Sequence, residues 1–210
     1  NSGHICLSVY SSGGFRQLGN ATKPVHVPND MKGLKWRTTK SPIEFMLVKN
    51  WGATPTPYDW SQLYSGLQSG VVEGQYVASP WQHVAKLHEV AKYFTEIGGM
   101  WSGNILAMDA KQYNALSSQE KKWLHKAADA YGEKVNELDN AWIKNGEDAI
   151  KASVKEWYVP SEAEMTKWRS GAIGAWLDAK GTFEPEVAKR VLLEQGMDGF
   201  VAQLEKAGAL

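Results

Sequence analysis

Arg37 is the residue whose type and position point most directly to a specific chemistry. It lies near the end of a stretch at residues 34–38 that is typical of a β-strand, just before a predicted helix start at Ser41. In open α/β sheets, ligands bind beyond the carboxyl ends of strands and near helix N-termini. A guanidinium group pairs with a carboxylate through two parallel hydrogen bonds, because its planar fork matches both oxygens. Arg37 is therefore a candidate binding residue for an organic acid, and a surface ion pair is the alternative.

Five tryptophans divide into two groups by position. Trp60, Trp81 and Trp101 lie at the ends of predicted elements. Rings in such places either line a pocket or pack in the core, and the sequence leaves both readings open. Trp123 and Trp142 fall on the apolar stripe of a long predicted helix. We predict that both of them are packing residues.

The chain carries no recognisable arrangement of residues for catalysis. It has no G-x-S-x-G elbow, no G-x-x-x-x-G-K-[ST] phosphate loop and no G-x-G-x-x-G fingerprint. His83 and His88 are five residues apart, which places them on different faces of a helix, and H-E-x-x-H is absent. The single cysteine, Cys6, rules out a disulfide within the chain, and we predict that it is a small buried residue of a strand. We expect no enzymatic activity, no cofactor and no metal site.

Composition excludes two further classes of partner. Lys plus Arg is 23 and Asp plus Glu is 23, so the formal net charge is zero. Nucleic-acid-binding faces need clustered excess positive charge, so we expect no nucleic-acid partner. No apolar run approaches the roughly 20 residues that span a bilayer. The apolar stretch at residues 5–10 is too short for a signal peptide and follows no basic segment, so an exported protein would have lost its signal.

The first ninety or so residues alternate short strand patterns with capped helices, which predicts an α/β fold with a largely parallel sheet. Ser41 and Glu44 match a capping box, with Pro42 at the first helical position. Ser79 and Gln82 repeat the pattern.

The remainder of the chain is mostly helical. A continuous helix over residues 118–154 would be about 55 Å long. We expect it to cross between two lobes or to bend at Gly132 or Gly146.

A collinear series of motifs resembles one family. The motifs are GFRQ at residues 14–17, PNDMKGLKWR at 28–37, GATPTP at 52–57, LYSGLQSGVVEGQ at 63–75 and EVAKY at 89–93. Together they resemble the periplasmic solute-binding subunit of tripartite ATP-independent periplasmic (TRAP) transporters, dicarboxylate-binding type. The resemblance implies a two-lobed α/β fold of the periplasmic binding protein type, with a long lobe-spanning helix and closure around the ligand.

The resemblance also implies roles for particular residues. Arg37 matches the arginine that pairs with the ligand carboxylate, Arg16 matches a second arginine near the ligand, and Trp60 matches an aromatic that contacts it. Gln75 falls on the strand that forms the cleft wall. The family commonly continues with an acidic residue and Asn, where this chain has Tyr76 and Val77. Because Val77 offers no amide, we expect a less polar ligand end or compensation by Tyr76 and Trp81.

The motifs begin near the strand that enters the family's second lobe, so the chain resembles a member truncated at its N-terminus, with the first lobe largely missing. We assign 1–102 to a second-lobe ligand-binding segment. We assign 103–154 to a return to the first lobe with the spanning helix, and 155–210 to a C-terminal helical segment packing on the second lobe. An exposed apolar patch and self-association would follow.

The function that the sequence favours is periplasmic capture of a small carboxylate-containing molecule and its delivery to TRAP-type membrane subunits. A hydrolytic enzyme with an unrecognised acid–base pair and a non-binding scaffold are the alternatives.

Overall fold

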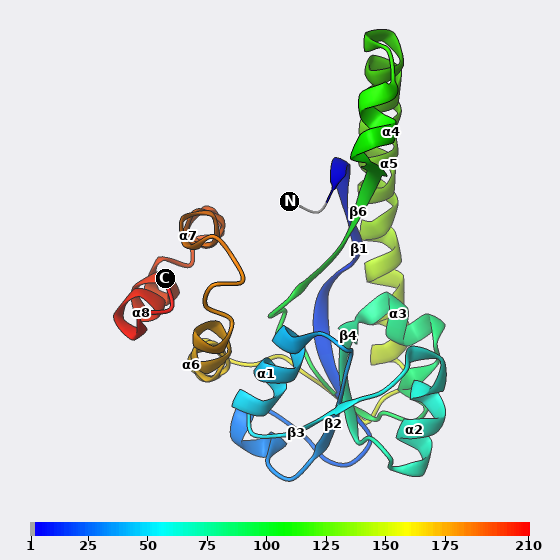
Figure 1. Ribbon diagram of the computed structural model, residues 1–210. Helices are drawn as coiled ribbons and strands as arrows, with labels where there is room; N and C mark the ends of the chain where they lie inside the picture. Colours follow the sequence, from blue (N-terminus) through cyan, green and yellow to red (C-terminus); the bar gives the residue numbers. More distant parts are fainter. Residues whose placement is uncertain (1–2) are drawn as a thin grey trace.

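A computed structural model describes residues 3–210 of the chain, and its framework is a seven-stranded sheet. The main path of the sheet runs β3-β2-β4-β1-β5-β7, and β6 pairs with a separate part of β1 (Figure 1). The strands are β1 (His4–Asn20), β2 (Lys35–Thr38), β3 (Thr54–Pro57), β4 (Gly74–Ala78), β5 (Tyr93–Thr95), β6 (Trp101–Asp109) and β7 (Glu156–Tyr158). The alternation of strands and helices confirms the predicted α/β class.

The prediction of a largely parallel sheet is wrong for its central strand. β1 is antiparallel to β4, β5 and β6, whereas β2 is parallel to β3 and β4, and β5 is parallel to β7. Parallel neighbours are produced by helical crossovers between successive strands. The connection from β1 to β2 contains only a short 3₁₀-helix, η1 (Pro28–Met31), and β2 is not a neighbour of β1.

The helices over the sheet begin and end largely where the sequence indicates. They are α1 (Pro42–Asn50), α2 (Leu63–Ser69) and α3 (Ser79–Val84), with the short 3₁₀-helices η2 (Trp60–Gln62) and η3 (Leu87–Glu89). Ser41 caps α1, and Gly70 ends α2 with a φ of +74°. The capping boxes predicted at Ser41 with Glu44 and at Ser79 with Gln82 are wrong. The Glu44 carboxylate accepts hydrogen bonds from Thr39 instead, and Ser79 lies inside α3 rather than at its cap.

The core of this lower part, which we call the base, forms around large side chains from strands and helices. Trp36 of β2, Tyr76 of β4 and Trp51 are buried there. α6 (Glu162–Asp178) adds Trp168, whose ring packs edge-on against Trp51 and whose indole N–H donates to the carbonyl of His26. Beyond α6, α7 (Pro185–Glu194) and α8 (Asp198–Ala207) form a smaller cluster with it.

α5 (Ser118–Lys151) is one unbroken helix of 34 residues that rises from the base (Figure 1). β1, β6 and α4 (Ala110–Ala115) lie along it, and we call the part of these elements above the base the column. The two glycines proposed as bend points are close-packing positions. A Cβ at Gly132 would meet the hydroxyl of Ser8, and one at Gly146 would come within 2.7 Å of Pro80 Cα.

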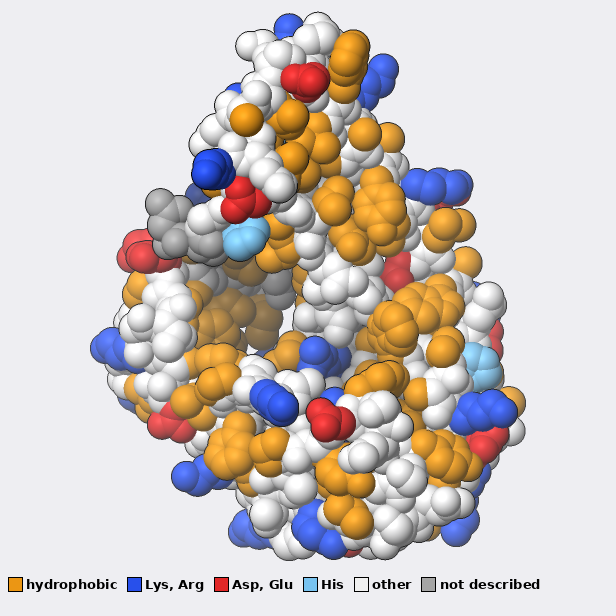
Figure 2. Space-filling view, turned by 45° about the vertical axis from the view of Figure 1, so that its right-hand side comes forward, with side chains coloured by type: hydrophobic (Ala, Val, Ile, Leu, Met, Phe, Trp, Pro, Cys, Tyr) orange, Lys and Arg blue, Asp and Glu red, His pale blue; other side chains and the backbone are white. Residues whose placement is uncertain are grey.

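The column leaves much of its apolar surface uncovered. Trp123 is 64% exposed, so its predicted role as a packing residue is wrong, whereas Trp142 packs edge-on against Trp81. Val9, Ile105 and Leu138 are also exposed, and hydrophobic side chains recur along the upper part of the molecule in the space-filling view (Figure 2). The expected exposed apolar patch is present.

Two other expectations can be settled. Cys6 lies in β1 as predicted, but it is exposed rather than buried. Among the residues that the structure describes, no helix combines the length and apolar composition needed to cross a bilayer.

Candidate ligand-binding site

A pocket of about 300 Å³ lies where the column meets the base. In the space-filling view this face is hollowed between the two parts, with basic side chains in the hollow and hydrophobic ones around it (Figure 2). The lining residues come from β1, β2 and its following loop, η2, β4, α3 and β6. They are Ser12, Arg16, Arg37, Thr39, Trp60, Val77, Trp81, Trp101, Ser102, Gly103 and Asn104.

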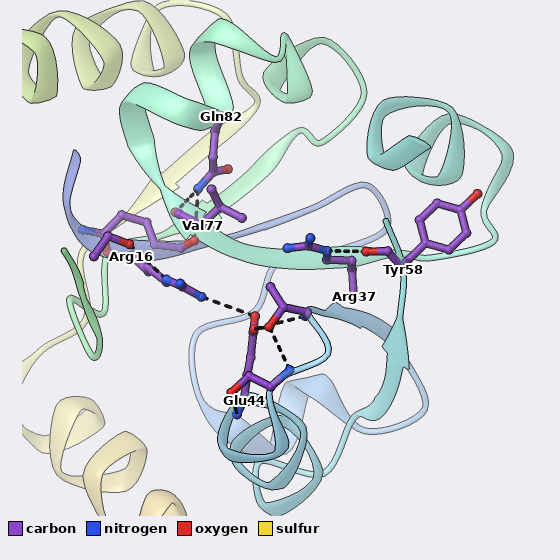
Figure 3. Close-up of polar contacts among 10 residues, drawn as sticks. Arg16, Arg37, Glu44, Tyr58, Val77 and Gln82 are labelled. Carbon is purple, nitrogen blue, oxygen red and sulfur yellow. Dashed lines mark hydrogen bonds and ion pairs between the residues drawn. The ribbon is translucent and has the colours of Figure 1, made fainter. Parts of the chain in front are cut away.

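Arg37 lies at the pocket with its guanidinium oriented by the backbone. The side chain is 5% exposed, and its Nε donates to the carbonyl oxygen of Tyr58 over 3.0 Å (Figure 3). No described residue forms a salt bridge with Arg37, so the alternative of a surface ion pair is wrong. The two terminal nitrogens, which form the edge that grips a carboxylate, therefore have no internal anion.

The electrostatic surroundings of Arg37 contain charges of both signs. Burial lowers the pKa of the Arg37 guanidinium, and the neighbouring charge of Arg16 acts in the same direction. Glu44 and Asp59 oppose this and raise the pKa. An arginine keeps its proton at neutral pH even when buried, so the site presents a permanent cation.

Arg16, the second predicted arginine, is held by an internal carboxylate. Its Nη1 lies 3.5 Å from Oε1 of Glu44, and its Nε donates to the hydroxyl of Ser102 over 3.1 Å. Glu44 is 2% exposed, and its other oxygen accepts from the backbone and hydroxyl of Thr39 (Figure 3). The two arginines thus differ: Arg16 is neutralised by the protein, and Arg37 is not.

Three tryptophans meet at the pocket. The ring centroids of Trp60 and Trp81 are 6.5 Å apart in an edge-to-face arrangement, and Cζ of Arg37 lies 5.9 Å from the Trp60 ring. Trp101 lines the pocket from β6. Of the two readings that the sequence left open, the structure favours pocket lining for all three.

The three predicted residues of β4 have different surroundings. Val77 lines the pocket, whereas Gln75 and Tyr76 do not. Gln75 is fully buried and its amide donates to the side chain of Gln82. Tyr76 is buried against Trp51, and burial raises the pKa of its hydroxyl. Because side chains alternate along a strand, Tyr76 faces away from the side that Val77 occupies.

A bulge in β1 brings an unpredicted residue, Ser12, to the pocket. The register with β6 shifts between Ser11 and Gly14, and Gly13 has a φ of +92°, which favours glycine. Asp139 of α5 accepts a hydrogen bond from the Gly13 N–H over 2.9 Å. The Ser-Ser-Gly-Gly run at residues 11–14 is the sequence signal for this break in the strand.

Glu44, Ser102 and Asn104 were also missed as residues of the site or its support. Only the three-dimensional arrangement brings them to it, because they lie in α1 and β6, far from β1 in sequence. Within the described part of the chain, no group of three or more His, Cys, Asp and Glu side chains is arranged to hold a metal ion.

A pocket that combines an unpaired arginine with aromatic walls, at strand ends of an α/β sheet, is typical of small-molecule binding proteins. Residues 1–180 match the family model described as bacterial extracellular solute-binding protein, family 7. The chain belongs to this family, which confirms the resemblance drawn from the motifs.

The chain is similar to several relatives of known binding activity. It is 29% identical over 150 residues to the ectoine-binding periplasmic protein TeaA of Halomonas elongata, a match that covers 71% of this chain and 43% of TeaA. It is also 29% identical over 124 residues to the 2,3-diketo-L-gulonate-binding periplasmic protein YiaO of Escherichia coli, covering 59% of this chain and 38% of YiaO.

Solved structures extend the likeness in fold over nearly the whole chain. The TeaA structure matches 97% of this chain and 65% of its own, with 25% identity and a TM-score of 0.76. A TRAP periplasmic solute-binding protein of Shewanella oneidensis with bound succinate matches 96% of this chain and 63% of its own, with 20% identity and a TM-score of 0.80. The chain therefore has the fold of TRAP periplasmic binding proteins and spans less than two thirds of these relatives.

Proposed function

We propose that this chain carries the carboxylate-binding site of an extracytoplasmic solute-binding protein. Arg37 supports this most strongly, because it is a buried guanidinium at the pocket, is oriented by the backbone and forms no salt bridge with any described residue. A carboxylate reaching it would form two charge-assisted hydrogen bonds, which are about twice as strong as neutral ones. Trp60, beside Arg37, would pack against the ligand body.

We propose further that the bound ligand is delivered in the periplasm to the membrane subunits of a TRAP transporter, and that it leaves chemically unchanged. The family supports this proposal. The relatives are named for periplasmic binding of ectoine and of a sugar acid, not for catalysis. Binding would shift the population toward a closed arrangement around the ligand, because only the closed state contacts it from both sides.

A ligand screen on purified protein tests the proposal. Small carboxylates should raise the melting temperature of the wild-type chain and should be recovered unaltered. Arg37→Ala should abolish this shift, because the loss of one partner of a desolvated charge pair typically weakens binding by at least about 30-fold. Arg37→Lys should weaken it, because Lys lacks the planar fork.

Arg190→Ala provides the matched control, because Arg190 is an exposed arginine of α7 outside the pocket. An unchanged carboxylate response in Arg37→Ala would refute the role of this residue. Chemical conversion of the ligand would favour the hydrolytic alternative, and silence against a broad metabolite panel would favour the non-binding scaffold.

A further inference from the structure

The charged groups at the pocket sum to a net charge of +1. Arg16 and Arg37 are the charged residues among its lining, and Glu44, 3.5 Å from Arg16, offsets one of them. Asp59, which influences Arg37, is exposed, so water and salt screen its charge. One uncompensated guanidinium matches one carboxylate. A second carboxylate would have no free cation to meet among the described lining residues.

The walls of the pocket combine polar and apolar surface in similar amounts, and three tryptophan rings supply much of the apolar part. Trp60, Trp81 and Trp101 are each between 38% and 45% exposed, although large aromatic rings are usually well buried. A Cβ at Gly103 would overlap the Trp101 ring, so the glycine allows that ring to lie against β6. Val77 adds an aliphatic side chain, which can neither donate nor accept a hydrogen bond.

The hydroxyl groups that line the pocket already have partners within the protein. The Thr39 hydroxyl donates to Glu44 and accepts from the Ser41 N–H. The Ser12 hydroxyl accepts from the Trp81 indole. The Ser102 hydroxyl accepts from Arg16. Besides Arg37, the polar side-chain groups left for a ligand among the described lining residues are the hydroxyl protons of Ser12 and Ser102 and the amide of Asn104. A ligand with many hydroxyl groups would lose more hydrogen bonds to water than these three groups can replace.

From these three observations we propose that the pocket selects a monocarboxylate with an apolar ring over dicarboxylates and polyhydroxylated sugar acids. This inference rests on the proposed function and specifies its ligand class. The carboxylate pairs with Arg37, and the ring packs among the three tryptophans. A ligand cation is disfavoured at Trp60, because it would lie next to the like charge of Arg37.

Calorimetric titration of the 210-residue chain with four probes tests this selectivity. Phenylacetate carries one carboxylate and an apolar ring, succinate two carboxylates, glucuronate one carboxylate with several hydroxyls, and glycine betaine a carboxylate with a cation. We expect phenylacetate to bind at least about tenfold more tightly than the other three.

The outcomes separate the two levels of the proposal. Tighter binding of succinate, glucuronate or glycine betaine than of phenylacetate would overturn the ligand class and leave carboxylate capture standing. Failure of all four to bind, together with silence in the wider carboxylate screen, would overturn both.

Two variants locate the selectivity in the named residues. Trp60→Ala should weaken phenylacetate about tenfold and change succinate much less, while Trp60→Phe should retain most of the phenylacetate affinity. Glu44→Gln leaves Arg16 uncompensated, so the preference for phenylacetate over succinate should fall about tenfold. A merely structural role of Glu44 would weaken both probes equally, and that result would overturn the charge argument.

Discussion

β1 and α5 run through both the base and the column, but their apolar side chains are buried in the base and largely exposed in the column. In the base, β1 contributes Leu18, which is fully enclosed, and α5 contributes Ile150. In the column, β1 exposes Val9 and α5 exposes Trp123 and Leu138. The apolar pattern continues along both elements, but other elements cover less of it in the column than in the base. The pocket lies at the junction of the two parts.

This difference shows that periodicity identifies a helix without identifying its buried residues. The stripe on α5 was correctly assigned as helical, yet burial depends on what packs against each turn. Where α3 packs on α5, Trp142 contacts Trp81. More than half of the helix away, Trp123 projects outward.

The largest contrast should come from a pair of tryptophans. Trp168→Ala removes a ring that is 2% exposed and packs against Trp51 in the base, so it should lower the free energy of unfolding by about 3–5 kcal/mol. Trp123→Ala, in the column, should change it by less than about 0.5 kcal/mol. Urea denaturation followed by circular dichroism measures both. Comparable losses for the two variants would contradict the division.

Two glycines of α5 offer a finer test. Alanine at Gly146 would press its Cβ against the backbone of Pro80, and such overpacking costs about 1–3 kcal/mol. Alanine at Gly132 meets only the Ser8 side chain, which can rotate, and gains about 1 kcal/mol of helix propensity. We expect a lower melting temperature for Gly146→Ala and an equal or higher one for Gly132→Ala. The reverse order would contradict close packing of α5 on α3.

α6 in the base begins with a capping box of Ser161 and Glu164, and α5 in the column begins with one of Ser117 and Glu120. The two should differ in their response to acid. Hydrogen bonds from Ser161 and Tyr158 lower the pKa of Glu164 in the base from 4.5 to about 2. Ser117 alone lowers the pKa of Glu120 in the column. A depressed pKa in the folded state stabilises the protein above pH 4.5, and this contribution is lost as the pH falls toward 2.

Melting temperatures measured from pH 6 to pH 2 should therefore fall less steeply for Glu164→Gln than for wild type. Glu120→Gln should alter the slope less than Glu164→Gln does. Identical slopes for wild type and Glu164→Gln would exclude the proposed contribution.

The smallest effect concerns association through the column. The exposed Ile105 and Leu138 should cause weak, concentration-dependent self-association, because water is excluded when such patches meet. Ile105→Lys should reduce it, and Ile43→Lys, an equivalent change in the base, should not. Sedimentation velocity over a concentration series measures this. A wild-type chain that stays monomeric throughout would contradict it.

Local signals in the sequence predicted much of the fold. Ser41 and Gly70 mark the ends of α1 and α2 through capping chemistry that depends only on neighbouring residues. The position of Arg37 near the end of β2 was likewise predictable, because strand ends meet at one edge of a sheet. The antiparallel pairing of β1 was not, since it depends on contacts between residues far apart in the chain.

The sequence also could not predict which side chains pair with one another in the site. Glu44 lies three residues after Ser41, and this spacing predicts a capping box. Its carboxylate instead accepts a hydrogen bond from Thr39 and forms an ion pair with Arg16. The sequence could place three neighbouring residues on one strand, namely Gln75, Tyr76 and Val77. It could not predict which of them would reach the pocket and which would be buried behind it. Val77 reaches the pocket, whereas Gln75 lies two residues deeper and meets Gln82.

A crystal structure of the chain with phenylacetate bound tests the central claim most directly. Both carboxylate oxygens should lie within hydrogen-bond distance of the terminal nitrogens of Arg37, with the phenyl ring among Trp60, Trp81 and Trp101. A carboxylate bound elsewhere, with the Arg37 guanidinium unengaged, would contradict the account.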